Sequence, residues 1–534
     1  MTTISSLNTA NAFASLYDTS VTKKPTSADD TPAASTTQPS TAVSIGQSVS
    51  ITPVYALPGI APVEAAPVWE GATNNAVSLL MAGNFAALSG AQQFQGLGAA
   101  LLNQIGAGGG DYSQSVLTPG ANASPTAVAN AQARLHGSAS NQITLEVTTT
   151  SGTQVEISLD SSSNGLAVSI DVKNGTLSAS DRSALNDLSK AFQSAIDGLT
   201  STSNPTLDLS GLEQFDSSAI ASIDFHASVP GDGGTQTVDF HVDNQVRKLS
   251  TSGPDGAINL TVNTADTMII GDAQQQQNAI TSYLQQFQNE QKRGNGNEAL
   301  MSMFEGAFAA LNSNYNVATP QERSLNAMLS TIPAAGQSLI TGLADFSASV
   351  VQTKKYSNPY QPGEVDSFSY QVSQTSEVDN SNPLNLSVTQ RQNSHLTASF
   401  HKALPGPNST LHLTKNIESQ NYDYFQIDDS ASSAAQVGYH KGLLVKATLT
   451  HSASQSTHKQ EYVQGVKTED TTTPAEQSWS KDFLPLLDTA QLGSRFDTPK
   501  SVERAQLTLQ AINRLVVLQM DPQAVESTAG RTVQ

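Results

Sequence analysis

Two aspartates and two histidines alternate within a segment that has the pattern of a β-hairpin. Asp224 and His226 are two residues apart, as are Asp239 and His241, and the dipeptide Asp232-Gly233 between them is typical of a two-residue turn. A turn there sets Asp224 opposite His241 and His226 opposite Asp239 on one face. Two imidazoles and two carboxylates suit Zn²⁺ or Ni²⁺, so the hairpin predicts either a weak metal site or two cross-strand ion pairs on a solvated face.

The other face of this hairpin supports the same alignment of its strands. With the turn at residues 232–233, apolar residues face one another along the whole ladder. The expected pairs are Ile223 with Val242, Phe225 with Phe240, and Ala227 with Val238. Because a shift by one residue would move every apolar side chain to the solvated face, we expect this alignment.

A second candidate metal site follows the spacing of an EF-hand calcium loop. Oxygen-bearing side chains at Asp160, Ser162 and Asn164 precede Gly165, and Asp171 stands at the twelfth position. Calcium requires such spacing because ligands at the first, third and fifth positions must surround one ion. The flanking residues have the pattern of strands instead of helices, so the alternative is an ordinary hairpin loop.

Histidines concentrate in one part of the sequence. Those between residues 395 and 458 are His395, His401, His412, His440, His451 and His458. Histidines on strands are commonly exposed without a function, but convergent imidazoles would bind a metal or form a surface whose charge changes near pH 6.5. Zinc and calcium are therefore the ions to consider, and no other cofactor is indicated.

The sequence strings that identify common catalytic sites are absent. There is no GxxxxGK[ST] phosphate loop, no GxSxG nucleophile elbow and no HExxH zinc helix. Glycosidase carboxylates carry no local signature, so a hydrolase stays open as an alternative. The sequence leaves enzymatic activity undecided and favours a protein without it.

A low-complexity leader opens the chain. Residues 1–67 are rich in Ser, Thr, Ala and Pro, and we expect them to be disordered. Proline recurs from Pro53 to Pro67, which excludes a helix or a central strand. Residues 68–136 follow as an Ala- and Gly-rich helical segment, in which glycines between Ala76 and Ile105 divide the helical pattern into two short helices.

Residues 141–268 have the pattern of one α+β unit that begins with a meander. Three runs of alternating apolar residues predict antiparallel strands, with Leu145 opposite Ile157 and Leu159 opposite Leu166. Each run has one apolar face, so the meander needs a covering element.

An amphipathic helix over residues 180–199 follows the meander. Ser180 is its expected N-cap, and its apolar stripe would cover the apolar face of the strands. Further strands of the same unit are expected at residues 220–229, 236–243 and 257–263.

The remainder of the chain alternates between helical and strand patterns. Residues 272–350 are expected to be helical, residues 364–467 to form a large antiparallel sheet of about six strands, and residues 476–521 to form C-terminal helices. The predicted fold class is therefore α+β, in which antiparallel sheet modules alternate with helical segments after a disordered N-terminal leader.

Charge and composition exclude several classes of protein. The 534 residues carry a formal net charge of −20, which disfavours binding to nucleic acid and to anionic membranes. Cysteine is absent, which excludes disulfides, thiolate catalysis and cysteine-ligated metals. The sequence contains no run of ~18 apolar residues, so no membrane span is expected.

Residues 1–20 are rich in Ser, Thr, Asn and Ala and carry no charge before Asp18. They lack the cationic start and the apolar core of a Sec signal peptide. In composition they resemble the N-terminal signals of type III and flagellar export substrates. The resemblance implies a bacterial protein that is secreted or surface-associated by a Sec-independent route, and a cytoplasmic protein is the alternative.

The strand faces give the functional expectation. Ser, Thr, Asn and Gln alternate with apolar residues in the predicted strands, so one face can form hydrogen bonds with a polar partner. We therefore expect a non-catalytic, exported or surface-associated protein that binds a protein or a glycan. A hydrolase and a cytosolic scaffold are the alternatives.

Overall fold

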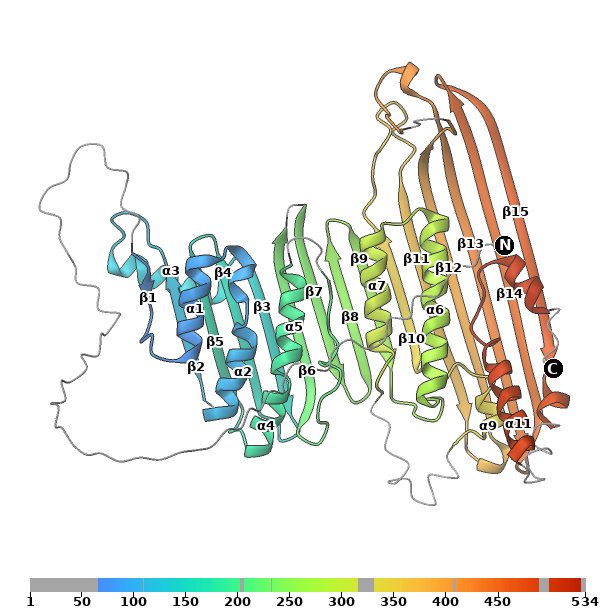
Figure 1. Ribbon diagram of the computed structural model, residues 1–534, viewed down its shortest axis with the longest axis horizontal. Coiled ribbons are helices and arrows are strands. Elements are labelled where there is room, and N and C mark those ends of the chain that lie inside the picture. Colours follow the sequence, from blue (N-terminus) through green and yellow to red (C-terminus); the bar gives the residue numbers. More distant parts are fainter. Residues whose placement is uncertain are drawn as a thin grey trace, which may run out of the picture. The chain divides into compact units, whose positions relative to one another are not determined.

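Strands and helices together give this chain an α+β fold, as the sequence predicts (Figure 1). The computed structural model describes residues 66–108, 110–201, 206–231, 233–315, 331–406, 410–488 and 499–529. The predicted leader up to residue 65 and Asp232 of the predicted turn lie outside the described residues. Within them, the strands form one antiparallel sheet of fifteen strands.

The longest strands lie on the C-terminal side of the sheet. They are β1 Val68–Trp69, β2 Tyr112–Leu117, β3 Asn141–Thr149, β4 Gln154–Ser162, β5 Gly165–Lys173, β6 Ile220–Gly231, β7 Gly234–Asp243, β8 Val246–Gly253, β9 Gly256–Asn263, β10 Asp345–Gln352, β11 Ser367–Asp379, β12 Ser387–Ala403, β13 Tyr422–His440, β14 Leu443–Val463 and β15 Val466–Asp482. Their order in the sheet is β1-β2-β5-β4-β3-β6, and β6 to β15 then follow in sequence.

The helices are short, apart from α6. They are α1 Ala76–Ala87, α2 Leu97–Gly108, α3 Pro125–Ser138, α4 Ala179–Asp187, α5 Ser189–Leu199, α6 Ala273–Gly294, α7 Glu298–Leu311, α9 Ala334–Gln337, α11 Pro499–Asn513 and α12 Pro522–Ala529, with short 3-10 turns at Gly90–Phe94, Pro383–Asn385 and Ile417–Ser419. No helix among the described residues is long and apolar enough to cross a membrane.

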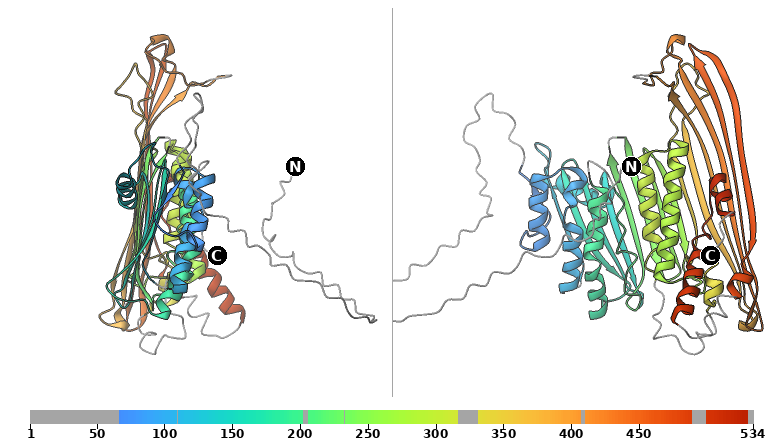
Figure 2. Two further views of the ribbon diagram at one scale, coloured as in Figure 1. Left: turned by 90° about the vertical axis from the view of Figure 1, so that its left-hand side faces the viewer. Right: turned by 45° about the vertical axis from the view of Figure 1, so that its right-hand side comes forward.

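Most helices pack on the same side of the sheet. Figure 2 shows α1, α2 and α4 to α7 on one face and α3 on the other. We call these the helix face, to which Leu145 of β3 and Phe225 of β6 belong, and the open face, to which Glu146 and Asp224 belong. The strands alternate apolar and polar residues, so the helix face is buried and the open face is polar.

The core lies between the helix face and the helices. Phe192 of α5 meets Phe225 edge to face, with ring centroids 6.2 Å apart. Tyr283 of α6 and Phe308 of α7 both pack against Phe346 of β10, at 5.3 and 5.1 Å. Aromatic rings bury large areas and prefer these tilted contacts, so they fix each helix over particular strands.

The hairpin predicted around residues 232–233 is confirmed. β6 and β7 pair so that Phe225 faces Phe240 and Asp224 faces His241. Alternation on both strands is unbroken, which excludes a shift by one residue, and the position of the turn signal in the sequence selects the alignment.

The predicted meander is present, with one difference in the alignment of its strands. β3 and β4 pair as predicted, but Leu159 of β4 faces Val168 of β5 instead of Leu166. The connection is a two-residue turn, because Ser162 already pairs with Gly165. A shift of two residues keeps the same side chains on the helix face, so the apolar pattern does not separate the two alignments.

The helix predicted over residues 180–199 is divided at Leu188 into α4 and α5. Its N-cap is Ser178 and not Ser180. The Ser178 hydroxyl accepts from the backbone N–H of Asp181 at 3.2 Å, and the Asp181 carboxylate accepts from the backbone N–H of Ser178 at 2.8 Å. This reciprocal capping box satisfies two N–H groups that Ser180 would leave free.

The segments predicted as helical also contain strands. Residues 68–136 include β1 and β2, residues 272–350 end in β10, and residues 476–521 begin with the last residues of β15. Within residues 364–467 the sheet has the four strands β11 to β14 and the first two residues of β15, instead of about six strands. β1 and β2 are short and the end of β15 is polar on both faces, so alternation does not reveal them, whereas β10 alternates over Phe346, Ala348 and Val350 and follows directly on a helical segment.

β8 is missing from the sequence prediction because its polar residues fall on both faces. Arg247 of β8 is buried on the helix face, where its guanidinium donates to the carbonyl oxygens of Leu311, Ser313 and Asn314 at 3.1, 2.6 and 2.8 Å. These carbonyls belong to the end of α7 and the residues after it. A cation there satisfies carbonyl groups that the helix leaves unbonded.

The two strand-rich segments of the sequence belong to the same sheet. β9 pairs with β10 along its whole length, although residues 264–344 separate them and contain α6 and α7. The open face is therefore continuous from the N-terminal strands to β15, and this continuity positions the candidate site.

Candidate functional site

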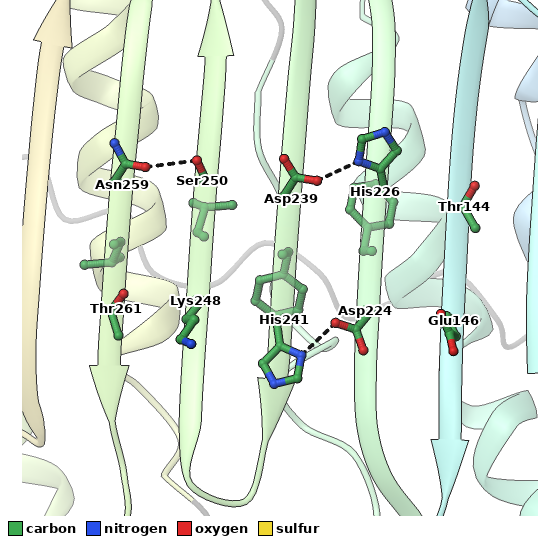
Figure 3. A pocket seen from close by; sticks show the side chains of 14 residues that line it. Thr144, Glu146, Asp224, His226, Asp239, His241, Lys248, Ser250, Asn259 and Thr261 are labelled. Atoms are coloured by element: carbon green, nitrogen blue, oxygen red, sulfur yellow. Dashed lines mark hydrogen bonds and ion pairs between the residues drawn. The ribbon is translucent and has the colours of Figure 1, made fainter. Parts of the chain in front are cut away.

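The hairpin of β6 and β7 brings the four predicted zinc ligands together on the open face (Figure 3). Asp224 lies opposite His241, and His226 lies opposite Asp239. The residues between them point to the helix face and are buried there. The sequence therefore determines both the register and the face of this patch.

Each histidine of the patch is held by one aspartate. Nδ1 of His226 is 2.6 Å from Oδ1 of Asp239, and Nδ1 of His241 is 2.7 Å from Oδ1 of Asp224. Nε2 of His241 also lies 3.4 Å from Asp243. A carboxylate only accepts, so Nδ1 carries the hydrogen in both close pairs. The side chains are a third to two thirds exposed, and such pairs contribute only ~0.2–1 kcal/mol each.

The four residues do not converge on one point. Figure 3 shows the rings of His226 and His241 directed toward opposite ends of the patch. Within the described residues, no group of three or more His, Asp or Glu side chains is placed to hold a metal ion. The register explains this, because it sets each imidazole against a carboxylate of the neighbouring strand. The patch consists of two hydrogen-bonded pairs, the alternative that the sequence left open.

The residues of the predicted calcium loop are spread over two strands and a turn. Asp160 and Ser162 lie in β4, Asn164 lies in the turn, and Asp171 lies near the far end of β5. They are not brought together, because the loop is only two residues long. Asp160 is instead buried and accepts a hydrogen bond from the Gln142 amide at 3.2 Å, and its burial raises its pKa to about 6.

The Asp–His patch is part of a longer depression in the open face. A hollow of about 420 Å³ extends from β3 to β9, and a second of about 390 Å³ continues from β9 to β12. Asn259 and Thr261 line both hollows, which joins them into one trough across the strands. Eight strands separated by ~4.8 Å span about 34 Å.

Two rows of directly opposed side chains line this trough. The first row is Glu146, Asp224, His241, Lys248, Thr261, Ser347, Ser373 and Asn393. The second row is Thr144, His226, Asp239, Ser250, Asn259, Ser349, Gln371 and His395. Every member carries a hydroxyl, amide, carboxylate, imidazole or ammonium group. The trough can therefore donate and accept hydrogen bonds at each strand along its length.

The histidines of residues 395–458 do not form one cluster. Three of them lie on the open face beside carboxylates, in the pairs His395–Asp428, His458–Asp470 and His401–Asp366. His451 lies on the helix face, where burial lowers its pKa to about 4, and His412 and His440 are exposed. Only His395 belongs to the trough.

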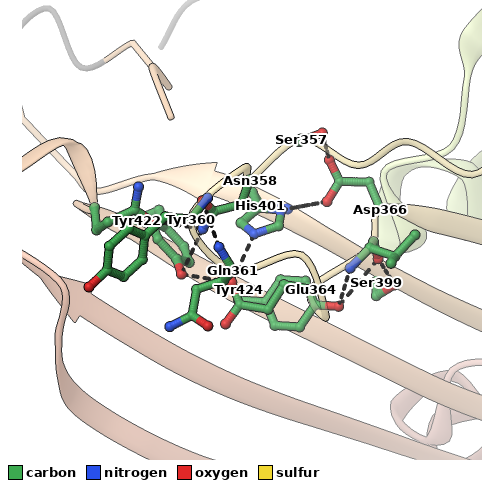
Figure 4. Close-up of polar contacts among 12 residues, drawn as sticks. Ser357, Asn358, Tyr360, Gln361, Glu364, Asp366, Ser399, His401, Tyr422 and Tyr424 are labelled. Carbon is green, nitrogen blue, oxygen red and sulfur yellow. Dashed lines mark hydrogen bonds and ion pairs between the residues drawn. The ribbon is translucent and has the colours of Figure 1, made fainter. Parts of the chain in front are cut away.

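His401 binds a loop that lies over the end of β12 and the start of β13 (Figure 4). Its Nδ1 is 2.6 Å from Oδ1 of Asp366, and its Nε2 is 3.1 Å from Oε2 of Glu364. The Tyr422 hydroxyl donates to the same oxygen of Glu364 at 2.7 Å, and the Asn358 amide donates to the Tyr422 hydroxyl at 3.0 Å. Residues 353–366, which connect β10 to β11, are thereby held on the open face, and we call them the strap.

The charges of this cluster support one another. Burial alone would lower the pKa of His401, but its hydrogen bonds to Asp366 and Glu364 outweigh burial and raise the pKa. Burial would likewise raise the pKa of each carboxyl, but the hydrogen bonds from His401 hold both below their usual range. Below the raised pKa of His401 and above the lowered pKa values of the two carboxyls, the cluster is an imidazolium between two carboxylates. Its stabilisation is lost when the pH rises through the raised pKa of His401 or falls through the lowered pKa values of the carboxyls.

Replacing His401 by glutamine is expected to loosen the strap. The substitution leaves two partly buried carboxylates without their cation, which costs far more than losing an exposed pair. Lys354 and Lys355 of the strap are exposed, so trypsin cleavage there at pH 7 measures its opening. We expect cleavage at least tenfold faster in His401→Gln, which corresponds to ~1.4 kcal/mol. His395→Gln, which removes an exposed pair, is the control and should not accelerate cleavage; equal rates in wild type and His401→Gln would contradict the role of His401.

A second buried charge cluster, under α6, also escapes sequence analysis. The Arg293 guanidinium donates to both carboxylate oxygens of Asp429 on β13, whose side chain is fully buried, and to the Thr457 hydroxyl at 3.1 Å. Glu290, one turn earlier on α6, is 3% exposed. A charged helix residue normally indicates the solvated side of a helix, and nothing in the local pattern marks Glu290 as buried.

No family model matches the chain, and no curated protein or solved structure matches it. The function is therefore inferred from the geometry of the site. The trough is long, open and polar, and its binding groups recur at the spacing of the strands. Such a surface suits a ligand that is itself extended and rich in hydrogen-bonding groups.

Proposed function

We propose that this protein is a binding protein whose open face holds an extended, polyhydroxylated polymer, a glycan chain, in the trough from β3 to β12. The observation that carries the proposal is the continuity of the two polar rows across eight strands. Hydroxyl groups both donate and accept hydrogen bonds, so a glycan can pair with the mixture of amides, hydroxyls, imidazoles and carboxylates that the rows present.

A glycan fits the trough better than a protein partner does. Hot spots of protein interfaces are enriched in Trp, Tyr and Arg, and neither row contains any of these. The rows consist largely of short hydroxyl and amide side chains, which lose little conformational entropy when a ligand orders them. Many weak polar contacts along ~34 Å would supply affinity without one dominant residue.

The proposal is tested by measuring binding of the full chain to hydroxyethyl cellulose and galactomannan, two neutral extended polysaccharides, immobilised on a sensor surface. The variant Ser250→Leu/Ser349→Leu fills both hollows with apolar side chains and removes the hydrogen bond of 2.9 Å from Ser250 to Asn259. We expect affinity at least tenfold weaker in this variant.

The matched control is Thr473→Leu, which places the same side chain at an exposed position of β15 outside both hollows. It should bind like the wild type. An equal loss in the control, or no binding of either polysaccharide by the wild type, would contradict the proposal.

We also propose that the chain is exported or associated with the cell surface, as suits a glycan-binding protein. The composition of residues 1–20 and the absence of cysteine support this. The test is to fractionate cultures that produce the chain with and without residues 1–25. Export predicts that the full chain reaches the medium or surface and that the truncated chain stays in the lysate, whereas equal retention of both would favour a cytoplasmic protein.

A further inference from the structure

The histidines of the trough share one arrangement. His226, His241 and His395 each lie in one of its two rows, and each is hydrogen-bonded to an aspartate of the neighbouring strand. All three imidazoles are on the open face, with side chains 50%, 32% and 41% exposed. They are accessible both to solvent and to whatever occupies the trough.

Two of these imidazoles have a ring nitrogen available for a ligand. Among the described residues, Nε2 of His226 and Nδ1 of His395 have no hydrogen bond within 3.5 Å, because the aspartates hold the opposite nitrogens. A neutral imidazole presents a lone pair at this nitrogen, and an imidazolium presents an N–H donor. Protonation therefore reverses the hydrogen bond that the trough offers a ligand at both positions.

Carboxylates surround the histidines of β6 and β7. Asp224 and Asp239 alternate with them along the strands, Asp243 is 3.4 Å from Nε2 of His241, and Glu146 of β3 lies opposite Asp224. The facing cation is Lys248 of β8, opposite His241. With neutral imidazoles, this end of the trough is negatively charged and repels anionic ligands.

The surroundings of His395 are simpler. Asp428 of β13 holds its Nε2 at 2.7 Å, while Gln371 of β11 and Ser430 of β13, which lie directly opposite it, carry no charge. Protonation of this imidazole cancels the charge of Asp428 and leaves an outward N–H donor. Protonation of each of the three histidines thus converts an ionised aspartate beside a neutral imidazole into an ion pair without net charge.

We propose that these histidines make the trough responsive to pH, so that it excludes glycans bearing carboxylates at mildly alkaline pH and binds them at mildly acidic pH. Protonation of the three imidazoles adds three positive charges to the trough, and at His226 and His395 it offers charge-assisted N–H···O⁻ bonds to the ligand, which are stronger than neutral ones. Imidazole is the side chain whose ordinary titration falls between pH 5 and 8, whereas the carboxylates of a glycan stay ionised there. The inference rests on the proposed function, since it assigns a class of glycan and its regulation to the same trough.

The experiment compares carboxymethyl cellulose with hydroxyethyl cellulose, an anionic and a neutral polymer with the same backbone, and adds galactomannan as the second neutral polymer. Binding of the full chain is measured at pH 5.5 and pH 8.0 and at low constant ionic strength, because salt screens the effect. We expect affinity for carboxymethyl cellulose to be at least tenfold higher at pH 5.5, with less than a twofold change for the neutral polymers.

The variant His226→Gln/His241→Gln/His395→Gln keeps hydrogen-bonding side chains but removes their titration. It should lose the gain at pH 5.5, while His440→Gln, at an exposed position outside the trough, should keep it. Binding of the neutral polymers without any gain for carboxymethyl cellulose overturns this inference and leaves the proposed function standing. If neither hydroxyethyl cellulose nor galactomannan binds at either pH, the proposed function fails first. A gain that survives in the triple variant assigns the pH response to other groups and also overturns the inference.

Discussion

Replacement of Phe192 by aspartate is expected to unfold the N-terminal half of the sheet at temperatures where the wild type is folded. Phe192 of α5 is fully buried between Phe225 of β6 and α2. A Cβ added at Gly98 of α2 would lie 2.9 Å from its ring, so α2 and α5 pack without space for rearrangement. Aspartate both removes the ring contacts and places an unpaired charge in the core, at a cost of more than ~4 kcal/mol.

The measurement is thermal unfolding followed by circular dichroism, with two comparison variants. Phe192→Leu removes the ring but adds no charge, and we expect its melting temperature to fall by less than that of Phe192→Asp. Ser183→Asp adds the same carboxylate at an exposed position of α4 and should melt like the wild type. An unchanged melting temperature in Phe192→Asp would show that α5 does not dock on the helix face.

The sequence predicts the parts of this fold that depend on neighbours along the chain. The hairpin around Asp224 and His241 is correct because two strands joined by a two-residue turn leave only one register that buries Phe225 against Phe240. The second connection of the meander is displaced by two residues because its sequence does not specify the position of the turn. Asp160 and Ser162 have the composition of a loop, but they extend β4, and alternation alone does not determine where the turn falls.

The features that escape sequence analysis depend on contacts between distant residues. The trough exists because β9 pairs with β10 across residues 264–344, and no local pattern specifies this pairing. The predicted calcium loop shows the complementary error, in which side chains with suitable spacing, such as Asp160 and Asp171, are carried apart by the strands. The spacing of residues in the sequence indicates a binding site only when they share one loop, or one face of a single helix or strand.

The cluster around His401 leaves little trace in the sequence. Glu364 and Asp366 are two residues apart, as are Glu377 and Asp379, and they lie more than thirty residues before His401. The strap carries no distinctive motif apart from its two prolines, which break the strand pattern. A connection that is longer than an ordinary turn and ends in two acidic residues is the only signal in the sequence, and it does not identify the histidine that the two carboxylates bind.

Replacement of Glu290 by glutamine is expected to stabilise the protein at alkaline pH, although glutamate is the native residue. Glu290 lies on the buried side of α6, and its Oε2 has no hydrogen-bond partner among the described residues. Burial, together with the charges of Asp429 and Asp521 and against the opposing charge of Arg293, raises the pKa of Glu290 to about 8. The folded protein therefore keeps this carboxyl neutral at pH 7.

The sign of the pH dependence follows from this protonation. In the unfolded chain a glutamate loses its proton near pH 4.3, so between that pH and about 8 the folded state holds one proton more than the unfolded state. The contribution of Glu290 to stability is complete below the lower value and is lost as the pH rises to the upper one. Glutamine has no such proton. The free energy of unfolding of the variant minus that of the wild type should therefore rise by on the order of 3 kcal/mol between pH 5.5 and 9.

Urea denaturation of wild type and Glu290→Gln at pH 5.5, 7 and 9 measures this difference. Glu503→Gln is the matched control, because it makes the same chemical change at an exposed position of α11 and should leave the difference from wild type constant with pH. Titration of the other groups affects all three proteins alike and cancels in the comparison. A Glu290→Gln protein whose difference from the wild type is the same at all three pH values would show that Glu290 is ionised in the folded state, and the polar environment under α6 would then have to accommodate its charge beside Asp429.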